Sequence, residues 1–413
     1  MNISNSIRKL TYIFVILFVG LSGGLVYWQV VKADNVSATI HNPRRCLREN
    51  SPMRGRIFDR NGILLAESVP DNNACGGYIR RYTDPSLAAV IGYYAPGVFI
   101  PGIEGEYNAE LTGNSGRTAL DNEVNKALHK SPVGNDIYLT IDERIQKIAV
   151  EKFNEYNPET DSFYQQFFSA GLAKPSNKGS VIITDPHTGA LLAMVSSPGY
   201  DPNKLVQTLG AGDYTYFNQL DKDPNYPLLV RPLKSRYSPG STFKTMTLMA
   251  ALDSGTTTLD HPWDKKSAAG PLFYQGREII GNNLGIEQGY TKHFPITTEY
   301  AYANSDNIVF AQLGVQTGLD KWLEYAKKLY IGQDDRFDLP TTVSKVENAD
   351  GTPLSQLQLA TNAFGQGVDD MTPLQMSMVD NTVANNGVLM RPMVVSKITD
   401  KDKNPLQTIA PRS

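Results

Sequence analysis

Residues 237–252 read YSPGSTFKTMTLMAAL, and this stretch decides the fold. The Pro-Gly pair ends a loop, so Ser241 is expected at the opening turn of a helix over residues 241–253. Lys244 is the only charged residue of the quoted stretch. A helix this apolar is expected to be buried at the centre of a domain.

The spacing of Ser241 and Lys244 suggests a nucleophile beside its base. Side chains at i and i+3 on a helix are neighbours, with Cβ atoms roughly 5–6 Å apart. A serine attacks a carbonyl only when a base takes its proton, and a lysine is that base only when its pKa is lowered. Burial and the positive end of the helix both disfavour the ammonium form of Lys244. The S-x-x-K pattern alone is weak, because a serine at a helix start is usually only a cap.

A second polar group changes this interpretation. Ala303-Asn304-Ser305-Asp306-Asn307 stands just before a helix expected over residues 308–316. As an ordinary helix cap the group needs no function. As a site it supplies a Ser305 hydroxyl that relays protons and an Asn307 amide that binds a substrate backbone. S-x-x-K with S-D-N and a third K-T-G element is the signature of penicillin-binding proteins and class A β-lactamases, and the first two elements occur here in that order.

With these elements the chain resembles the monofunctional (class B) penicillin-binding proteins, which are peptidoglycan D,D-transpeptidases of the cell-division and elongation type. Three further segments carry the resemblance. Residues 54–66 (RGRIFDRNGILLA) are similar to the segment that follows the family's membrane anchor, residues 185–203 to its first sheet hairpin, and residues 363–376 to its G-Q-G…T-P-L-Q-M stretch. No E-D-x-x-F glycosyltransferase motif precedes them, which argues against the bifunctional class A type.

The resemblance implies a mixed α/β (α+β) fold like that of the serine β-lactamases, with an antiparallel sheet flanked by helices and incomplete at its C-terminus. The implied division is a cytoplasmic tail over residues 1–9, a transmembrane anchor over 10–31, a small dimerisation-like pedestal over 32–135 and a transpeptidase domain over 136–413. Within the last domain, the sequence itself predicts a hairpin over residues 180–197 and helices over residues 142–153, 320–330 and 373–384.

The resemblance also implies roles for the four site residues. Ser241 would attack the carbonyl of a D-Ala–D-Ala stem peptide, release D-alanine and form an acyl-enzyme, while Lys244 accepts its proton. Ser305 would pass a proton to the leaving amine, and Asn307 would bind the substrate amide. An amine of a neighbouring stem would then resolve the ester into a cross-link, and β-lactams would acylate Ser241 as mimics of the dipeptide. No metal or organic cofactor is implied; the implied partners are the membrane, a polytopic glycosyltransferase and division or elongation proteins.

The chain departs from the family pattern at two places. Val230-Arg231-Pro232 stands where the family commonly has Asn-Arg-Ala, and no Lys-Thr-Gly or Lys-Ser-Gly occurs among the 413 residues. In relatives that element lies on a strand that binds the substrate carboxylate and helps to form the oxyanion hole. Two explanations compete: the sequence is truncated from an active enzyme, or it ends naturally as an inactive or binding-only relative. Both explanations predict that a polypeptide of these 413 residues is acylated by β-lactams weakly or not at all.

The N-terminal residues predict an uncleaved transmembrane anchor. Residues 10–31 carry no charge, follow Arg8 and Lys9, and span roughly 30 Å as a helix, which is the thickness of a bilayer core. Positive charge on the short side predicts a cytoplasmic N-terminus and an extracytoplasmic remainder at the cell membrane. A cleaved signal peptide and a buried soluble helix are the alternatives, and the apolar run is long for a signal peptide.

Composition excludes several other classes. The net charge is −3, which argues against a protein held to nucleic acid by bulk charge. Two cysteines exclude a disulfide-rich scaffold, although export would permit Cys46 and Cys75 to form one bridge rather than remain separate thiols. The five histidines include no i, i+4 pair, and no phosphate-binding glycine motif occurs, so a zinc protease and a nucleotide enzyme are disfavoured.

Three rival functions share part of this pattern. A serine β-lactamase can also carry S-T-F-K, but the anchor, residues 54–66 and Asn307 argue against it. A penicillin-sensing receptor should carry several membrane segments, and one is predicted here. A membrane-anchored β-lactam-binding or scaffold protein without transpeptidase activity is the remaining alternative. The sequence does not distinguish a septal from an elongation role, nor does it give the cross-bridge chemistry or the oligomeric state.

Overall fold

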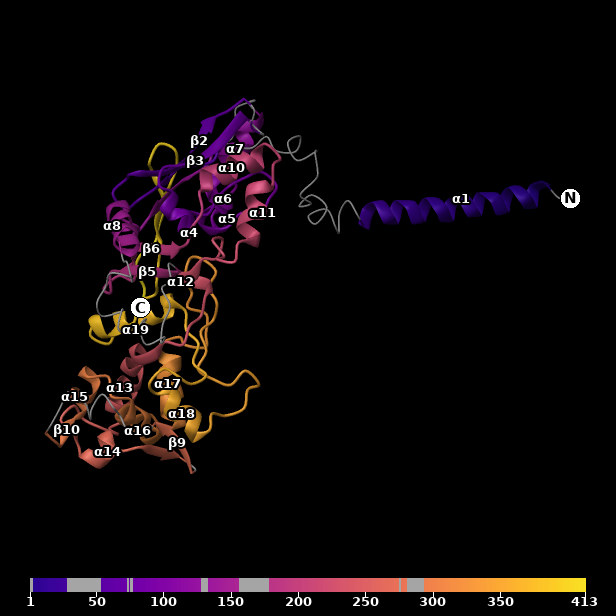
Figure 1. Cartoon of the computed structure of the whole chain (residues 1–413). Coiled ribbons are helices and arrows are strands. Elements are labelled where there is room, and N and C mark those ends of the chain that lie inside the picture. Colours follow the sequence, from indigo (N-terminus) through magenta and orange to yellow (C-terminus); the bar gives the residue numbers. More distant parts are fainter. Residues whose placement is uncertain are drawn as a thin grey trace.

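The computed structural model describes residues 3–27, 53–72, 74, 77–127, 133–155, 178–274, 276–280 and 293–413. Figure 1 shows α1 (Ile3–Val26), a sheet with helices at one end of the main body, a hairpin in its middle and a group of helices at the other end. The C-terminus lies beside the middle of the body (Figure 1). The predicted Cys46–Cys75 pairing falls on residues outside the described ranges.

The helix α1 exposes most of its apolar side chains, among them Phe14 and Phe18. Across the parts of the chain that the structure describes, no helix has both the length and the apolar character needed to cross a membrane. The predicted anchor over residues 10–31 continues past the end of α1 into residues that are not described, so it stays a prediction.

The largest described sheet joins segments from both halves of the sequence. Its strand order is β12-β11-β4-β1-β2-β3. The strands are β1 (Ile57–Phe58), β2 (Leu64–Pro70), β3 (Tyr78–Tyr82), β4 (Asp136–Leu139), β11 (Val395–Thr399) and β12 (Pro405–Thr408). The hairpin signal at Asn61-Gly62 is confirmed, because β1 and β2 pair antiparallel and Gly62 adopts φ 83°.

The strand β4 lies in the middle of this sheet. It pairs parallel with β1 and antiparallel with β11. The predicted domain boundary, just before residue 136, therefore separates β4 from the strands β1–β3 with which it forms one sheet. The boundary itself stays a prediction.

Short helices cover the sheet, and one buried cluster of charged side chains lies among them. These elements are η3 (Pro85–Leu87), α4 (Ala88–Ile91), α5 (Gly102–Glu106), α6 (Asn108–Leu111), α7 (Gly116–Ala127), α10 (Pro202–Gly210) and α11 (Thr215–Lys222). The Glu104 carboxylate is fully buried and accepts hydrogen bonds from Arg54 and Arg80. These cations lower the pKa of Glu104 although burial, the largest single effect, acts in the opposite direction.

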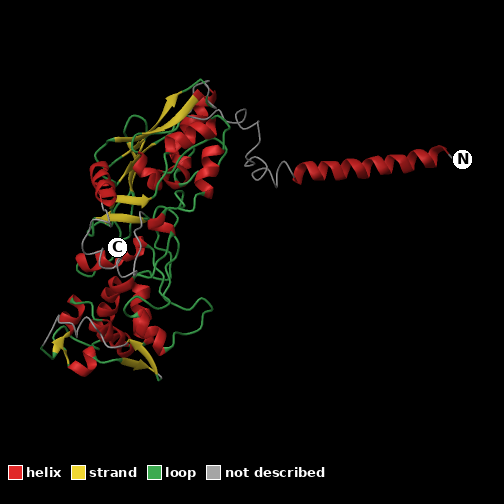
Figure 2. Cartoon of the chain, viewed as in Figure 1, coloured by secondary structure: helices red, strands yellow, loops and turns green. Residues whose placement is uncertain are grey.

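The predicted hairpin over residues 180–197 is confirmed as β5 (Gly179–Thr184) and β6 (Leu191–Ser197), paired antiparallel. Within the described residues these two strands form a sheet of their own. Helix α8 (Glu143–Glu155) packs on β6, while α12 (Arg231–Lys234) and α19 (Pro373–Ala384) pack nearby, α19 against β5. Figure 2 shows this hairpin between the large sheet and the helical end.

The helical end surrounds one central helix. The elements are η4 (Gly240–Phe243), α13 (Lys244–Asp253), α14 (Lys265–Ala269), α15 (Thr298–Ala303), α16 (Asn307–Thr317), α17 (Leu319–Lys328) and α18 (Gln356–Asn362), with the strand pairs β7 (Pro262–Trp263) and β10 (Ile296–Thr297), and β8 (Leu272–Tyr274) and β9 (Arg277–Ile280). Helix α13 packs against α16 and α17, and Phe243 and Met246 are fully buried. The prediction that this helix is central and buried is confirmed.

Candidate active site

Ser241 lies on the single 3₁₀ turn that precedes α13, with its residue exposed to solvent. Two hydrogen bonds fix the turn from outside. The Gly240 N–H donates to the Gly365 carbonyl at 2.8 Å, and the Ser238 hydroxyl donates to the same oxygen at 2.7 Å. The segment around Gly365 therefore sets the position of the Ser241 backbone.

Lys244 is the centre of the polar cluster, and its residue is only 1% exposed. Its Nζ donates to Ser241 Oγ at 2.8 Å, to Ser305 Oγ at 3.1 Å and to Asn307 Oδ1 at 2.6 Å. An ammonium group has three N–H donors, so these three oxygens use all of them. The structure thus brings all four predicted site residues into one hydrogen-bonded cluster.

Burial lowers the pKa of Lys244 from its ordinary value of 10.5 to about 8, and the nearby Asp306 charge opposes this shift. The rings of Phe310 and Phe364 each have their centroids 5.9 Å from Nζ. Their faces favour the cation, but they also exclude the water that would solvate it. Because the pKa is lowered to about 8, a large fraction of Lys244 is the neutral amine at mildly alkaline pH.

Ser305 and Asn307 are positioned by the cap of α16. The Asp306 carboxylate, 1% exposed, accepts hydrogen bonds from the Ile308 and Val309 N–H groups at 2.8 and 3.1 Å. Ser305 stands before this cap with φ 58°, in the left-handed region that few residues other than glycine adopt. The helix cap is confirmed, because Asp306 caps α16, and its two neighbours turn toward Lys244. The roles predicted for Ser305 and Asn307 stay predictions.

Gly365 is a site residue to which the sequence assigned no role. It adopts φ 83°, and a Cβ added to it would lie 1.9 Å from the Gly240 carbonyl oxygen. Only glycine can therefore lie this close to the nucleophile loop. Gly-Gln-Gly was identified by resemblance alone, and nothing in the local pattern indicates which distant loop it contacts.

Arg231, at the first departure from the family pattern, has a structural part. It is 3% exposed, and its guanidinium donates to the Asn225 and Tyr226 carbonyls at 2.5 and 3.2 Å. It holds the loop that enters α12, and its described hydrogen bonds do not reach the polar cluster. Among the described residues, no group of three or more His, Cys, Asp or Glu side chains could hold a metal ion.

Two family models match the chain. The penicillin binding protein transpeptidase domain matches residues 179–412, and the penicillin binding protein A dimerisation domain matches residues 54–137. The peptidoglycan D,D-transpeptidase PbpA of Mycolicibacterium smegmatis is 30% identical over 415 residues, covering 99% of this chain and 78% of that protein. PbpA of Mycobacterium tuberculosis is 29% identical, covering 96% of this chain and 76% of that protein.

Solved structures give the same result. The imipenem acyl-enzyme complex of penicillin-binding protein A from M. tuberculosis aligns with TM-score 0.74 at 27% identity, covering 88% of this chain and 78% of that one. The ceftriaxone acyl-enzyme complex of the same protein aligns with TM-score 0.75 at 28% identity, covering 89% and 77%. The D,D-transpeptidase domain of a peptidoglycan glycosyltransferase from Eggerthella lenta aligns with TM-score 0.67 at 27% identity, covering 87% and 76%.

Proposed function

Because the chain belongs to the penicillin-binding protein transpeptidase family, a family of serine-type enzymes whose relatives are named peptidoglycan D,D-transpeptidases, we propose that Ser241 is its acylated nucleophile. The observation that carries this proposal is the 2.8 Å contact between Ser241 Oγ and the buried Lys244 Nζ. A hydroxyl at this distance can pass its proton directly to a neutral amine. The substrate would be the D-Ala–D-Ala end of a peptidoglycan stem peptide.

We propose that Lys244 and Ser305 serve the proton transfers. Lys244 takes the Ser241 proton as Oγ attacks the carbonyl, and the tetrahedral intermediate collapses when the leaving amine of D-alanine gains a proton through Ser305. The Ser305 hydroxyl lies 3.1 Å from Nζ, so the proton travels along existing hydrogen bonds. An acceptor amine then attacks the ester and the Ser241 hydroxyl is restored. Asn307 holds Nζ and would bind the substrate amide.

Labelling with a fluorescent penicillin tests the nucleophile. We expect the label on Ser241, identified by mass spectrometry of the labelled peptide after a long incubation. Ser241→Ala should abolish labelling, whereas the control Ser254→Ala, on the exposed end of α13, should not change it. A label that persists in Ser241→Ala would contradict the proposal.

We further propose that a polypeptide of these 413 residues acylates slowly. It has no Lys-Thr-Gly or Lys-Ser-Gly element, and one lost oxyanion-hole donor typically reduces a rate by about 10²–10³. The second-order acylation rate is therefore expected at least ~100-fold below that of M. smegmatis PbpA measured beside it. Equal rates for the two proteins would reject this proposal.

A second candidate is a membrane-anchored β-lactam-binding or scaffold protein without transpeptidase activity. Wall growth in cells that carry variants of the protein distinguishes the enzyme from the scaffold. If the chain acts as an enzyme, Ser241→Ala should impair wall growth as much as deletion of the gene. If it acts as a scaffold, Ser241→Ala should leave wall growth intact while deletion of residues 32–135 impairs it.

We propose that residues 10–31 anchor the protein in the cell membrane, with its N-terminus in the cytoplasm and the Ser241 cluster outside. The uncharged run and the preceding Arg8 and Lys9 support this. Most of the protein should sediment with membranes and be digested by protease added to spheroplasts. Phe18→Lys, which places a charge in the middle of the run, should release protein from the membrane fraction, and a soluble wild-type protein would contradict the anchor.

The expected partners at the membrane are a polytopic glycosyltransferase and division or elongation proteins.

A further inference from the structure

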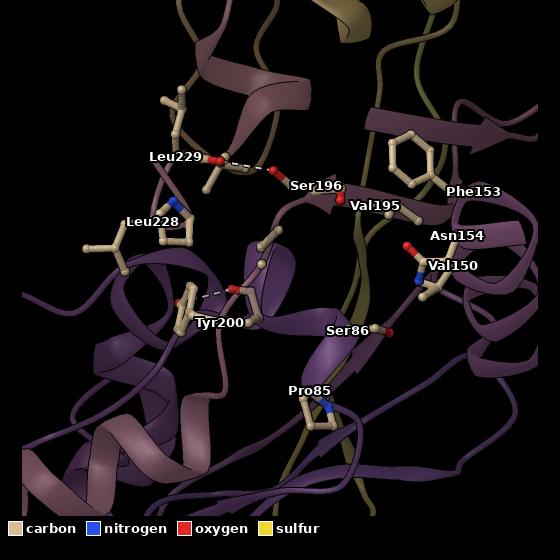
Figure 3. Close-up of a pocket in the computed structure, with 16 residues that line it drawn as sticks. Pro85, Ser86, Val150, Phe153, Asn154, Val195, Ser196, Tyr200, Leu228 and Leu229 are labelled. Carbon is tan, nitrogen blue, oxygen red and sulfur yellow. Dashed lines mark hydrogen bonds between the residues drawn. The ribbon is translucent and has the colours of Figure 1, made fainter. Parts of the chain in front are cut away.

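A cavity of about 190 Å³ lies at the junction of the large sheet's helices with the β5–β6 hairpin. Figure 3 shows Phe153 and Val150 of α8 on one side, Leu228 and Leu229 on the opposite side, and Val195 of β6 between them. None of the four residues of the Ser241 cluster lines it. The cavity is therefore separate from the proposed active site.

The cavity has mostly apolar walls. Val195 is buried, Phe153 and Leu228 are half-buried, and Ala89 of α4 and Pro227 complete the apolar lining. None of the described residues that line the cavity carries a charged side chain. A charged ligand would lose its hydration here without gaining a counter-charge, which is costly. The lining therefore selects an uncharged molecule.

Several hydroxyl groups and the Asn154 carboxamide give the cavity its polarity. The Ser196 hydroxyl donates to the Leu229 carbonyl at 2.9 Å and accepts from the Arg231 N–H at 3.1 Å, so it is already paired. The Tyr200 hydroxyl reaches the Ala88 carbonyl only at 3.4 Å (Figure 3), and the Ser86 hydroxyl lies 3.5 Å from Gln146 Nε2. These long contacts leave room for a shorter hydrogen bond from a ligand.

The ionisation state of Tyr200 supports the same class of ligand. Burial is the largest cause of a strongly raised pKa for its phenol, and the neighbouring Tyr93 and Tyr216 act in the same direction. The phenol is therefore neutral at physiological pH and can either donate or accept one hydrogen bond. A ligand with a single polar group satisfies it.

The volume sets the size of the ligand. An apolar cavity of about 150 Å³ is large enough for a benzene ring, so this one has room for a ring with a short substituent. We propose that the cavity binds an uncharged, largely apolar molecule of single-ring size that carries one hydrogen-bonding group. The ring lies between Phe153 and Leu228, and the polar group meets the hydroxyl of Tyr200 or Ser86.

Three probes of equal size test the charge selection. Benzyl alcohol is titrated into the full chain in lipid nanodiscs, with free probe measured against empty nanodiscs, and compared with benzoate and benzylammonium. The methyl signals of Val195 and Leu228 should shift saturably with benzyl alcohol, while those of the exposed Leu406 stay unchanged. The two ions should bind at least tenfold more weakly. Equal binding of all three probes, or no saturable shift with benzyl alcohol, overturns the proposal.

Two variants test the location. Ala89→Leu adds side-chain volume to the cavity wall and should weaken benzyl alcohol binding at least tenfold, whereas Ala109→Leu, at an exposed position on α6, should leave it unchanged. Leu228→Ala should weaken benzyl alcohol but admit the larger 1-naphthalenemethanol at least tenfold more tightly than the wild type does. Unchanged affinities in both cavity variants would place the probe elsewhere and overturn the proposal.

Discussion

At Lys244, burial and a neighbouring charge act in opposite directions. Burial among apolar side chains disfavours the ammonium ion, while the negative charge of Asp306 favours it. The result is a pKa of about 8 rather than 10.5. A base must lose its proton near the working pH and must be able to regain it, and this intermediate value permits both.

The titration of Lys244 can be followed directly. In protein with ¹³C-labelled lysine, the Cε signal of Lys244 should titrate with a midpoint near pH 8. The control is Lys321, whose pKa is raised from 10.5 because it donates to Glu324; its signal should still be that of the cation at pH 10. A Lys244 midpoint above pH 10 would show that burial does not decide its charge.

The same shift makes stability depend on pH. Between pH 8 and 10.5 the unfolded chain holds a proton on Lys244 that the folded chain has lost, so the unfolded state binds more protons. The free energy of unfolding is therefore expected to increase with pH across that window through this group. Lys244→Met should remove this contribution, and chemical unfolding of both proteins at pH 8 and pH 10 measures it.

A charge at position 307 should reverse the lowering of the pKa. Asn307 Oδ1 lies 2.6 Å from Lys244 Nζ, so Asn307→Asp places a carboxylate against the ammonium group without changing its shape. An opposite charge this close typically shifts a pKa by about 1–3 units. The Lys244 midpoint should rise accordingly and acylation at pH 7.5 should slow. Asn304→Asp, at an exposed neighbouring position, is the control, and an unchanged midpoint in Asn307→Asp would refute the assignment.

At the scale of single residues, the spacing in the sequence already predicted the main contact of the site. Lys244 reaches the Ser241 hydroxyl because residues three apart share a helix face, and the 2.8 Å distance confirms this geometry. The approach of Ser305 and Asn307 followed only from the family resemblance. The roles of all four residues stay predictions. Gly365 was missed because its partner, Gly240, is 125 residues earlier in the chain.

At the scale of elements, the contact between Gly365 and the nucleophile loop invites a test. In Gly365→Ala, the new Cβ would lie 1.9 Å from the Gly240 carbonyl oxygen, so one of the two segments must move. The matched control is Gly387→Ala, which has a similar φ of 85° and nothing within 4 Å of the added Cβ. Both variants carry backbone strain of about 1–3 kcal/mol, and only Gly365→Ala adds the clash.

We therefore expect Gly365→Ala to lose at least about 2 kcal/mol more unfolding free energy than Gly387→Ala, because the backbone displacement comes on top of the shared strain. Denaturant unfolding measures the difference. Penicillin labelling of Ser241 should also slow in Gly365→Ala and not in Gly387→Ala. Equal losses of stability in the two variants would show that the Gly240 loop can move to accept the new Cβ without a loss of unfolding free energy.

Helix ends were predicted well where a local signal exists. Thr372 and Pro373 mark the start of α19, and the predicted range 373–384 matches the observed one. The helix predicted over 241–253 instead begins with a 3₁₀ turn, because Gly240 and the Gly365 contact hold that turn from outside. Helix α17 ends two residues before the predicted Tyr330, which adopts φ 60° beyond the helix end.

At the scale of the whole molecule, the large sheet joins strands from the two halves of the sequence. Ile398 of β11 pairs with Ile137 of β4 and is 3% exposed within the core of the sheet. Removing most of its side chain, in Ile398→Ala, should reduce the unfolding free energy by about 2–5 kcal/mol. The control Leu406→Ala, on the exposed strand β12, should change it by no more than about 0.5 kcal/mol.

Two probes decide whether the sheet couples the halves. Hydrogen exchange of β2 and of α13 should accelerate together in Ile398→Ala if both belong to one cooperative unit. Acceleration in β2 alone would show that the sheet and the helical end unfold separately. The control for both outcomes is Leu406→Ala, in which the hydrogen-exchange rates of β2 and α13 should not change.

The topology of the sheet was not predictable from the sequence. Period-two patterning indicates that a segment is a strand, but it carries no information on which distant strand it joins. The β11–β12 hairpin was therefore not expected beside β4, and the predicted boundary before residue 136 divides strands that pair with each other. The β5–β6 hairpin was predictable because its two strands are neighbours in sequence with a turn between them.

The position of β11 has a consequence during synthesis. One edge of β4 is complete only when residues 395–399 have been made, 256 residues after β4 ends at Leu139. At about 5–20 residues per second, that edge waits roughly 10–50 s for its partner. Through that interval the edge of β4 in the nascent chain is unpaired and exposed. Exposed, unpaired strand edges promote aggregation. A holding chaperone that binds extended segments should therefore raise the yield of folded protein most during this interval.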